Sequence, residues 1–170
     1  TVNCDDIPNA PTNIIASDNC DEEIIVSLEE SITEGNCDYN YVLIRTWKAI
    51  DDCGNEATKA QLITIQDLEA PVFDSEPRDI AIGCEETIPT PSSLTATDNC
   101  GTATITLEEE IIEGICEDTY DIVRTWTATD DCGNSTTTSQ TISIGDSAVP
   151  EITNLPADVT VSCDNIPAAV

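Results

Sequence analysis

Hydrophobic and polar residues alternate along two segments of nearly the same wording, YVLIRTWKAI (41–50) and YDIVRTWTAT (120–129). A period of two is typical of a β-strand with one buried face. The segment 135–144 alternates in the same way after a Gly-Asn turn, and 22–30 and 102–110 are rich in β-branched residues. No long stretch has the 3.6-residue period of a helix, so the pattern predicts an all-β chain. In the second segment one face carries Tyr120, Ile122, Arg124, Trp126 and Ala128.

The same landmarks return after about 79 residues. Each cysteine of a second set follows its counterpart in the first by one such repeat length: Cys4, Cys20, Cys37 and Cys53, then Cys84, Cys100, Cys116 and Cys132. Cys163 begins the series again, one repeat length after Cys84. We therefore expect a first repeat at 1–67 that lacks its opening residues, a complete second repeat at 68–146, and the start of a third at 147–170.

The strand spacing predicts the fold of each repeat. Short strands separated by Pro- and Gly-containing turns within about 79 residues are typical of an antiparallel β-sandwich of immunoglobulin type. We expect these repeats to be arranged in tandem, end to end. A domain of this size buries limited apolar surface and needs additional stabilisation, such as disulfide cross-links.

Composition narrows the possible functions. Asp and Glu number 34 against 5 Lys and Arg, with no His, and the net charge is −29. Such a chain repels nucleic acid and anionic lipid, and no apolar run approaches the roughly 20 residues of a membrane helix, so we expect neither as a partner. Without His, a Ser–His or Cys–His dyad is impossible, and adjacent carboxylates such as Glu29 and Glu30 point to opposite strand faces. We expect no enzyme.

The cysteines predict disulfides rather than zinc. The chain has no His and no Cys-x-x-Cys, and consecutive cysteines within a repeat lie much farther apart than the paired ligands of a zinc site. Disulfides in an acidic, strand-rich chain indicate an oxidising, extracellular location. Four cysteines allow three connectivities, and spacing alone does not choose among them.

Topology favours one connectivity. In an immunoglobulin-type sandwich, the turns after the second and the penultimate strands share one end. This predicts Cys20–Cys53 and Cys100–Cys132 at that end, with Cys4–Cys37 and Cys84–Cys116 toward the other.

Acidic residues accompany the paired turns, and two interpretations remain open. Asp and Asn side chains form tight turns, and Gly54 and Gly133 permit a left-handed residue. Alternatively, carboxylates gathered at one end repel one another, and Ca²⁺ would remove that cost. In the second interpretation the linker contributes as well, and the calcium ligands come from Asp67, Asp98, Asp130 and Asp131.

Arg45 and Arg124 fall on the same strand face as the tryptophans. A charge on a core face needs a partner, because an unpaired buried charge is very costly. We expect structural ion pairs with a neighbouring strand, from Glu29 or Glu30 in the first repeat and from Glu108–Glu110 in the second.

The motifs TATDNCG (95–101), RTWTATDDCGN (124–134) and LPADVTVSC (155–163) resemble the tandem repeats of SprB-type gliding-motility surface adhesins of Bacteroidetes, which are similar to hyalin repeats with an immunoglobulin-like fold. The resemblance implies type IX secretion, display on the outer membrane and a role in attachment and gliding. It also makes Ser147, in an Asp-Ser-Ala sequence, a candidate O-glycan acceptor.

Two functions of different classes follow. The first is a structural stalk of a giant cell-surface adhesin, whose partners are the neighbouring repeats, while other parts of the protein contact an extracellular surface or glycan. The alternative is a glycan- or protein-binding immunoglobulin-like module of a secreted bacterial protein. A glycan platform needs exposed aromatic side chains, whereas Trp47 and Trp126 both lie on the inward strand face. This favours the stalk.

Overall fold

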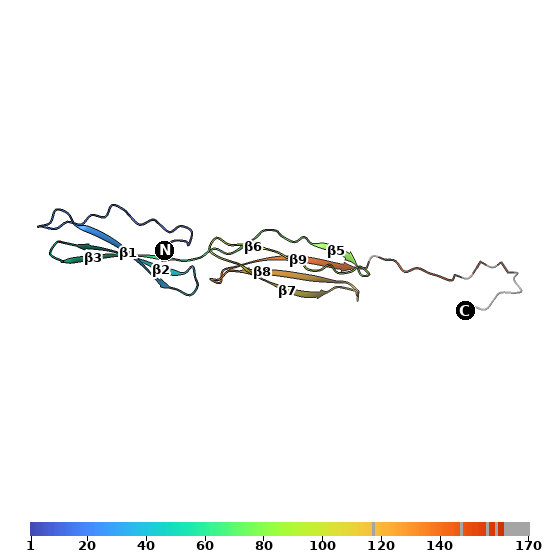
Figure 1. Ribbon diagram of the computed structural model, residues 1–170. Helices are drawn as coiled ribbons and strands as arrows, with labels where there is room; N and C mark the ends of the chain where they lie inside the picture. The colour runs from blue at the N-terminus through green and yellow to red at the C-terminus, as the bar shows by residue number, and fades with distance from the viewer. Residues whose placement is uncertain (117, 147, 156, 159, 162–170) are drawn as a thin grey trace.

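The computed structural model describes residues 1–116, 118–146, 148–155, 157–158 and 160–161. All regular secondary structure in these residues is β (Figure 1). The strands are β1 (Ile25–Glu34), β2 (Tyr41–Ile50), β3 (Glu56–Ile65), β4 (Val72–Phe73), β5 (Ile80–Gly83), β6 (Ala96–Thr97), β7 (Thr104–Glu113), β8 (Tyr120–Thr129) and β9 (Ser135–Gly145). Among the described residues, no helix is long and apolar enough to cross a membrane.

The first repeat is built on an antiparallel sheet of order β1-β2-β3. The bounds of β2 are those predicted, whereas β1 begins at Ile25 and continues to Glu34, beyond the predicted 22–30. One further bridge pairs Val2 with Ile65 in parallel, so the start of the chain lies along the outer edge of β3.

The second repeat has a four-stranded sheet of order β5-β9-β8-β7, and a two-stranded sheet of β4 and β6 supplies the second layer. The prediction of a purely antiparallel sandwich is wrong in one respect, because β5 pairs with β9 in parallel. The physical reason is that β5 enters from the linker in the direction of β9 and occupies its open edge. The alternating sequences of β8 and β9 did not indicate that β9 also pairs with β5 on its other side.

Strand pairing recurs with the period of the sequence. The pair Val2–Ile65 corresponds to Ile82–Ile144, one repeat length further along the chain. The turn from Glu34 to Tyr41 corresponds in the same way to the turn from Glu113 to Tyr120. The two repeats therefore place their turns and cysteines in equivalent positions.

The core lies mainly in the second repeat. Every second residue of β8 from Ile122 to Ala128 is buried, which confirms the predicted inward face, and Ile142 of β9 is inaccessible. Trp126 is 2% exposed, whereas its counterpart Trp47 is only partly buried. The small sheet of β4 and β6 covers the second repeat, and among the described residues no such pair forms in the first.

The two sheets follow one another along the long axis of the molecule, and the amino terminus lies beside the region where they meet (Figure 1). The linker at this position is packed, since Pro71 is fully buried and Asp67 is 3% exposed. The region where the first repeat meets the second is called the junction below.

Candidate functional site

Two disulfides cross the junction. Cys4 is bonded to Cys100 with a Cα–Cα distance of 5.9 Å, and Cys37 to Cys132 with 5.2 Å. Both therefore join the first repeat to the second. The predicted pairs Cys4–Cys37 and Cys100–Cys132 are wrong, because all four of these cysteines bond across the junction instead.

The other two predicted bridges are not formed either. Cys20, Cys53, Cys84 and Cys116 are exposed free thiols. The turns of Cys20 and Cys53 do lie together, since the Asp52 N–H donates to Asp21 Oδ2 at 3.1 Å. The prediction placed the turns at one end correctly but assumed that bridges close within a repeat. Cys163 and the candidate glycan acceptor Ser147 lie outside the described residues.

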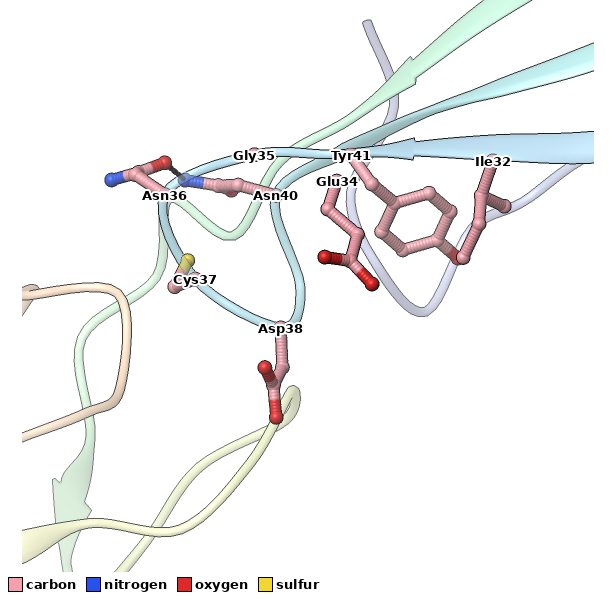
Figure 2. Close-up of a pocket in the computed structure, with 8 residues that line it drawn as sticks. All are labelled: Ile32, Glu34, Gly35, Asn36, Cys37, Asp38, Asn40 and Tyr41. Carbon is pink, nitrogen blue, oxygen red and sulfur yellow. Dashed lines mark hydrogen bonds between the residues drawn. The ribbon is translucent and has the colours of Figure 1, made fainter.

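Cys37 is positioned by the turn between β1 and β2. A Cβ at Gly35 would overlap the Asn40 carbonyl oxygen, so glycine is required for the chain to reverse so tightly. Asn40 then fixes the turn: its N–H donates to the Cys37 carbonyl at 3.0 Å, and its Nδ2 donates to Asn36 Oδ1 at 3.0 Å (Figure 2). Its Oδ1 accepts the Asp67 N–H at 2.9 Å, which ties the turn to the linker.

The same turn borders a hollow of about 450 Å³ lined by residues between Ile32 and Tyr41. Figure 2 shows Ile32, Glu34 and Tyr41 on its strand side, with Asp38 at the tip of the turn. One hairpin end lines the whole hollow, and its polar groups do not converge on a point. We therefore assign it no ligand.

Three further contacts cross the junction. The Tyr39 ring lies against Gly101, where a Cβ would come within 3.0 Å of Tyr39 Cε2. Asn134 Nδ2 donates to the Asp67 carbonyl oxygen at 3.3 Å. Asn3 Nδ2 donates to Glu69 Oε1 at 2.6 Å, between the amino-terminal segment and the linker. The cystines thus sit within a packed, hydrogen-bonded interface.

The junction also collects carboxylates. Asp67 is 3% exposed and Asp130 is 8% exposed. Asp98 Oδ1 accepts the Cys100 N–H at 2.8 Å, as expected of a turn-forming aspartate. Its Oδ2 is buried and has no hydrogen-bond partner among the described residues. A buried carboxylate oxygen without a donor is unusual, since buried polar groups are normally hydrogen-bonded.

The two buried aspartates differ in their electrostatics. Burial raises the pKa of Asp67, and the charges of Asp98, Asp130 and Glu69 raise it further against the opposing Glu69 N–H. Burial acts the same way on Asp130, but hydrogen bonds from the Asn134 side chain and from backbone N–H groups outweigh it and lower its pKa. Hydrogen bonds therefore favour the ionised form of Asp130, whereas burial and neighbouring carboxylates disfavour the ionised form of Asp67.

The structure brings together two of the four predicted calcium ligands, Asp67 and Asp98. Oxygens of Asp67 and Asp98 lie within 4.8 Å of each other and of Cys100 Sγ, although a disulfide sulfur is no ligand for a hard cation. Asp130 uses both oxygens for Asn134 and its own turn. Asp131 is exposed and lies outside this group. The end of the first repeat away from the junction is called the free end below. There Asp18, Asp21 and Asp51 form a more exposed group of the same size.

The arginines lie away from the junction. Arg45 Nε donates to Glu30 Oε1 and Arg124 Nε donates to Glu109 Oε1, each at 2.7 Å. Both glutamates belong to the sets expected from sequence. Arg45 also donates to the Pro8 carbonyl at 2.8 Å. These pairs have a structural role within each sheet.

Sequence reasoning missed the junction as an interface. The one available signal was a difference between the copies, where TDNCG has Gly101 and SDNCD has Asp21. At the junction a Cβ at position 101 would crowd the Tyr39 ring, so glycine favours the close contact. The sequence did not reveal the junction contacts of Asn3, Asn40 and Asn134, because Asn is common in turns whether or not it contacts another repeat.

Comparisons with known proteins show what the second repeat resembles. A family model described as "HYR-like domain with 4 cysteines" matches residues 72–144. No curated protein matches the chain. Among solved structures, human mucin-like protocadherin EC1-2 is similar at 12% identity, over 74% of this chain and 86% of that one, with a TM-score of 0.30. Residues 72–144 therefore resemble an HYR-like domain, and the two disulfides are typical of an extracellular domain.

Proposed function

We propose that this chain is a segment of an extracellular adhesion stalk in which immunoglobulin-like repeats stand in tandem, end to end. The observation that carries the proposal is that both disulfides of the described residues cross the junction and neither closes within a repeat. Disulfides whose role was to stabilise one small domain would join two cysteines of that domain. Bridges between domains hold the domains to one another.

The bridges change how the chain responds to tension. Cys4–Cys100 connects residues with a sequence separation of 96, so the covalent path between the chain ends no longer includes the polypeptide between these cysteines. At about 3.4 Å per residue, the bond removes roughly 330 Å from the maximum extension of the chain. Tension then bypasses most of the first repeat and the whole linker. This suits a stalk, which must keep its length while it holds a distant contact.

The binding-module alternative has less support. Trp126 is 2% exposed and Trp47 is partly buried, so neither offers a flat face to a sugar ring. Tyr39 is 37% exposed but lies against Gly101 at the junction. The proposal assigns no catalytic role to the chain.

The finer assignment follows the motifs. On the resemblance of TATDNCG and RTWTATDDCGN to SprB-type repeats, the stalk belongs to a giant adhesin of a gliding bacterium, exported by type IX secretion and displayed on the outer membrane. Attachment to a surface or glycan would then be the task of other parts of the protein. Localising an epitope-tagged chain on intact cells tests this, and a chain retained inside the cell would contradict it.

Calcium at the junction is a second part of the proposal. The donor set suits a hard cation, because Asp67 and Asp98 bring two carboxylates together and Asp98 Oδ2 has no donor among the described residues. These two residues would hold the ion, which would cancel their repulsion and fix the angle between the repeats. Asp130 would act indirectly, by keeping its turn in place.

Calorimetric titration with Ca²⁺ tests the calcium site, with Asp98→Asn as the variant and Asp131→Asn as its matched control. Asn keeps the Oδ1 acceptor for the Cys100 N–H, so Asp98→Asn removes charge without removing the turn. At about 10 mM Ca²⁺, a site with the affinity of extracellular modules stabilises the fold by about 1.4 to 2.7 kcal/mol. Equal binding by Asp98→Asn and the unaltered chain would leave these aspartates as turn formers.

Single-molecule stretching between the chain ends tests the stalk. Under oxidising conditions, unfolding should release only the residues that lie outside the loop closed by the Cys4–Cys100 bond. After reduction, the releasable length should grow by the sequence separation of 96 between Cys4 and Cys100, which is about 330 Å. An extension that is the same before and after reduction would overturn the proposal.

A further inference from the structure

The four free cysteines occupy the same places in their repeats as the four bonded ones. Cys84 and Cys116 lie one repeat length after Cys4 and Cys37, while Cys20 and Cys53 lie one repeat length before Cys100 and Cys132. All four free thiols are exposed. The outer end of each of the two repeats therefore carries one half of the cysteine set that is complete at the junction.

The backbone around the carboxy-terminal pair matches the bonded counterpart. The turn at Cys4 is closed by Asp6 N–H to the Asn3 carbonyl at 3.1 Å, and the turn at Cys84 by Glu86 N–H to the Gly83 carbonyl at 3.0 Å. The Asn40 N–H donates to the Cys37 carbonyl at 3.0 Å, and the Thr119 N–H to the Cys116 carbonyl at 3.1 Å. These two cysteines are thus presented as their bonded counterparts are.

The amino-terminal pair matches as well. The Cys20 N–H donates to Asp18 Oδ1 and the Cys100 N–H to Asp98 Oδ1, both at 2.8 Å. The Cys53 turn is held by an Asn55 side chain on Asp51, as Asn134 holds Asp130 in the turn of Cys132. Gly54 and Gly133 have φ of 86° and 93° in these turns. The half-sites at the two ends are therefore preformed.

We infer that the two ends are complementary halves of the same double-disulfide junction, and that this molecule couples head to tail with a further unit of its own kind. Cys84 bonds the Cys20 position of the next unit, and Cys116 bonds its Cys53 position. A second unit placed as the second repeat lies on the first would set these pairs at the Cα separations of the junction, 5.9 and 5.2 Å. The inference goes beyond the stalk function, since it assigns a partner and the residues that join it.

Each bond is a two-electron oxidation, and glutathione disulfide is a sufficient oxidant. The Cys84 thiolate attacks it, forms a mixed disulfide and releases one glutathione thiolate. The Cys20 thiolate of the next unit attacks the protein sulfur of that mixed disulfide and releases the second. Two thiols thus become one cystine, and glutathione disulfide becomes two glutathione molecules.

The outer ends differ from the junction at more than one contact. Gly83 and Ala148 stand one repeat length after Asn3 and Glu69, so the hydrogen bond between those two side chains has no counterpart there. Where Tyr39 meets Gly101, the outer ends carry Asp118 and Asp21. Coupling therefore brings carboxylates together, between molecules of net charge −29. Salt screens this repulsion, so coupling should proceed faster at high ionic strength.

The test uses the chain itself as the probe, with Cys163→Ser in every sample to remove the remaining cysteine. One variant blocks the amino end (Cys20→Ser with Cys53→Ser), and the other blocks the carboxy end (Cys84→Ser with Cys116→Ser). All are incubated in glutathione redox buffer at low and at high salt, and separated without reduction. The chain with both ends open should form a ladder, and each variant alone should remain monomeric. An equimolar mixture of the two variants should stop at the dimer.

Peptide mapping of that dimer should show Cys84–Cys20 and Cys116–Cys53 between chains. A ladder from either variant alone, peptides joining Cys20 to Cys53 or Cys84 to Cys116 within one chain, or monomers with four alkylatable thiols at high salt would each overturn the inference. The bonds Cys4–Cys100 and Cys37–Cys132 are mapped in the same digests. Their absence would count against the stalk proposal, so the two failures are distinguishable.

Discussion

The turn pair of the first repeat and that of the second are nearly the same sequence in two different surroundings. SDNC and DDCGN at the free end leave Cys20 and Cys53 exposed, whereas TDNC and DDCGN at the junction have Cys100 buried and Cys132 bonded. The internal hydrogen bonds of the turns are alike. Burial, bonding and altered electrostatics therefore come from the neighbouring repeat and not from the turn itself.

The largest expected contrast is between Cys132→Ser and Cys53→Ser, which make the same change in the two copies. Cys132→Ser opens a loop of many tens of residues and should cost about 4 kcal/mol on the chain-entropy model. Cys53→Ser alters an exposed free thiol and should change the free energy of unfolding by less than about 0.5 kcal/mol. Urea unfolding followed by tryptophan fluorescence measures both. Equal effects would mean that the bridges add nothing specific to the junction.

The next contrast concerns packing at Gly101. In Gly101→Ala the new Cβ meets the Tyr39 ring, and we expect a cost of about 1 kcal/mol. Asp21→Ala, at the same position of the first repeat, loses only an acceptor for the exposed Asp52 N–H and should cost less than about 0.5 kcal/mol. Adding Tyr39→Ala should relieve the first effect and leave the second unchanged. Additive effects of Tyr39→Ala and Gly101→Ala would show that the two residues do not interact.

Acid titration separates Asp67 from Asp130. The pKa of Asp67 is raised, so its contribution to stability is fully present below its unfolded pKa of 3.8 and is lost as pH rises through its folded pKa. The pKa of Asp130 is lowered, so its contribution is present above 3.8 and is lost as pH falls through the folded value. The groups facing Asp67 are Asp98, Asp130 and Glu69.

In chelator, Asp67→Asn should therefore remove a fall in stability above pH 3.8, while Asp130→Asn should weaken the fold at neutral pH. Thermal melts across pH measure both. Asp18→Asn, in a turn of the first repeat away from the junction, serves as the control for the substitution itself. An unchanged profile in Asp67→Asn would contradict the electrostatic account of the junction.

The smallest contrast is between the two arginine pairs. Glu109→Gln leaves the 3%-exposed Arg124 without its carboxylate, whereas after Glu30→Gln the Arg45 guanidinium keeps the Pro8 carbonyl. Both glutamates are nearly half exposed, so water screens the loss and we expect a difference of about 1 kcal/mol or less. A larger cost for Glu30→Gln would show that Pro8 does not support Arg45.

The strands were predictable because burial on one face leaves an alternating pattern. The bounds of β2 and β8 and the glutamate sets that pair with Arg45 and Arg124 follow from that pattern. The parallel edge strand β5 was missed, since so short a strand cannot show alternation.

The disulfide pairing was not predictable from spacing, because a regular repeat gives each cysteine equivalent partners within its own unit and in the next. The choice depends on how the ends of two repeats fit together. That fit rests on particular contacts such as Tyr39 with Gly101, and on the Asn134 amide donating to the linker at Asp67. Hydrophobic periodicity carries no information about such contacts.

The span of the two cystines has a consequence for biogenesis. Four other cysteines lie between Cys4 and Cys100 in the chain, so oxidation in order of appearance would join the wrong sulfurs. Correct pairing requires either that oxidation waits until the following repeat has folded, or that early bonds are reshuffled by thiol–disulfide exchange. One repeat is then not mature until its successor has emerged, and the chain completes its covalent structure one junction at a time.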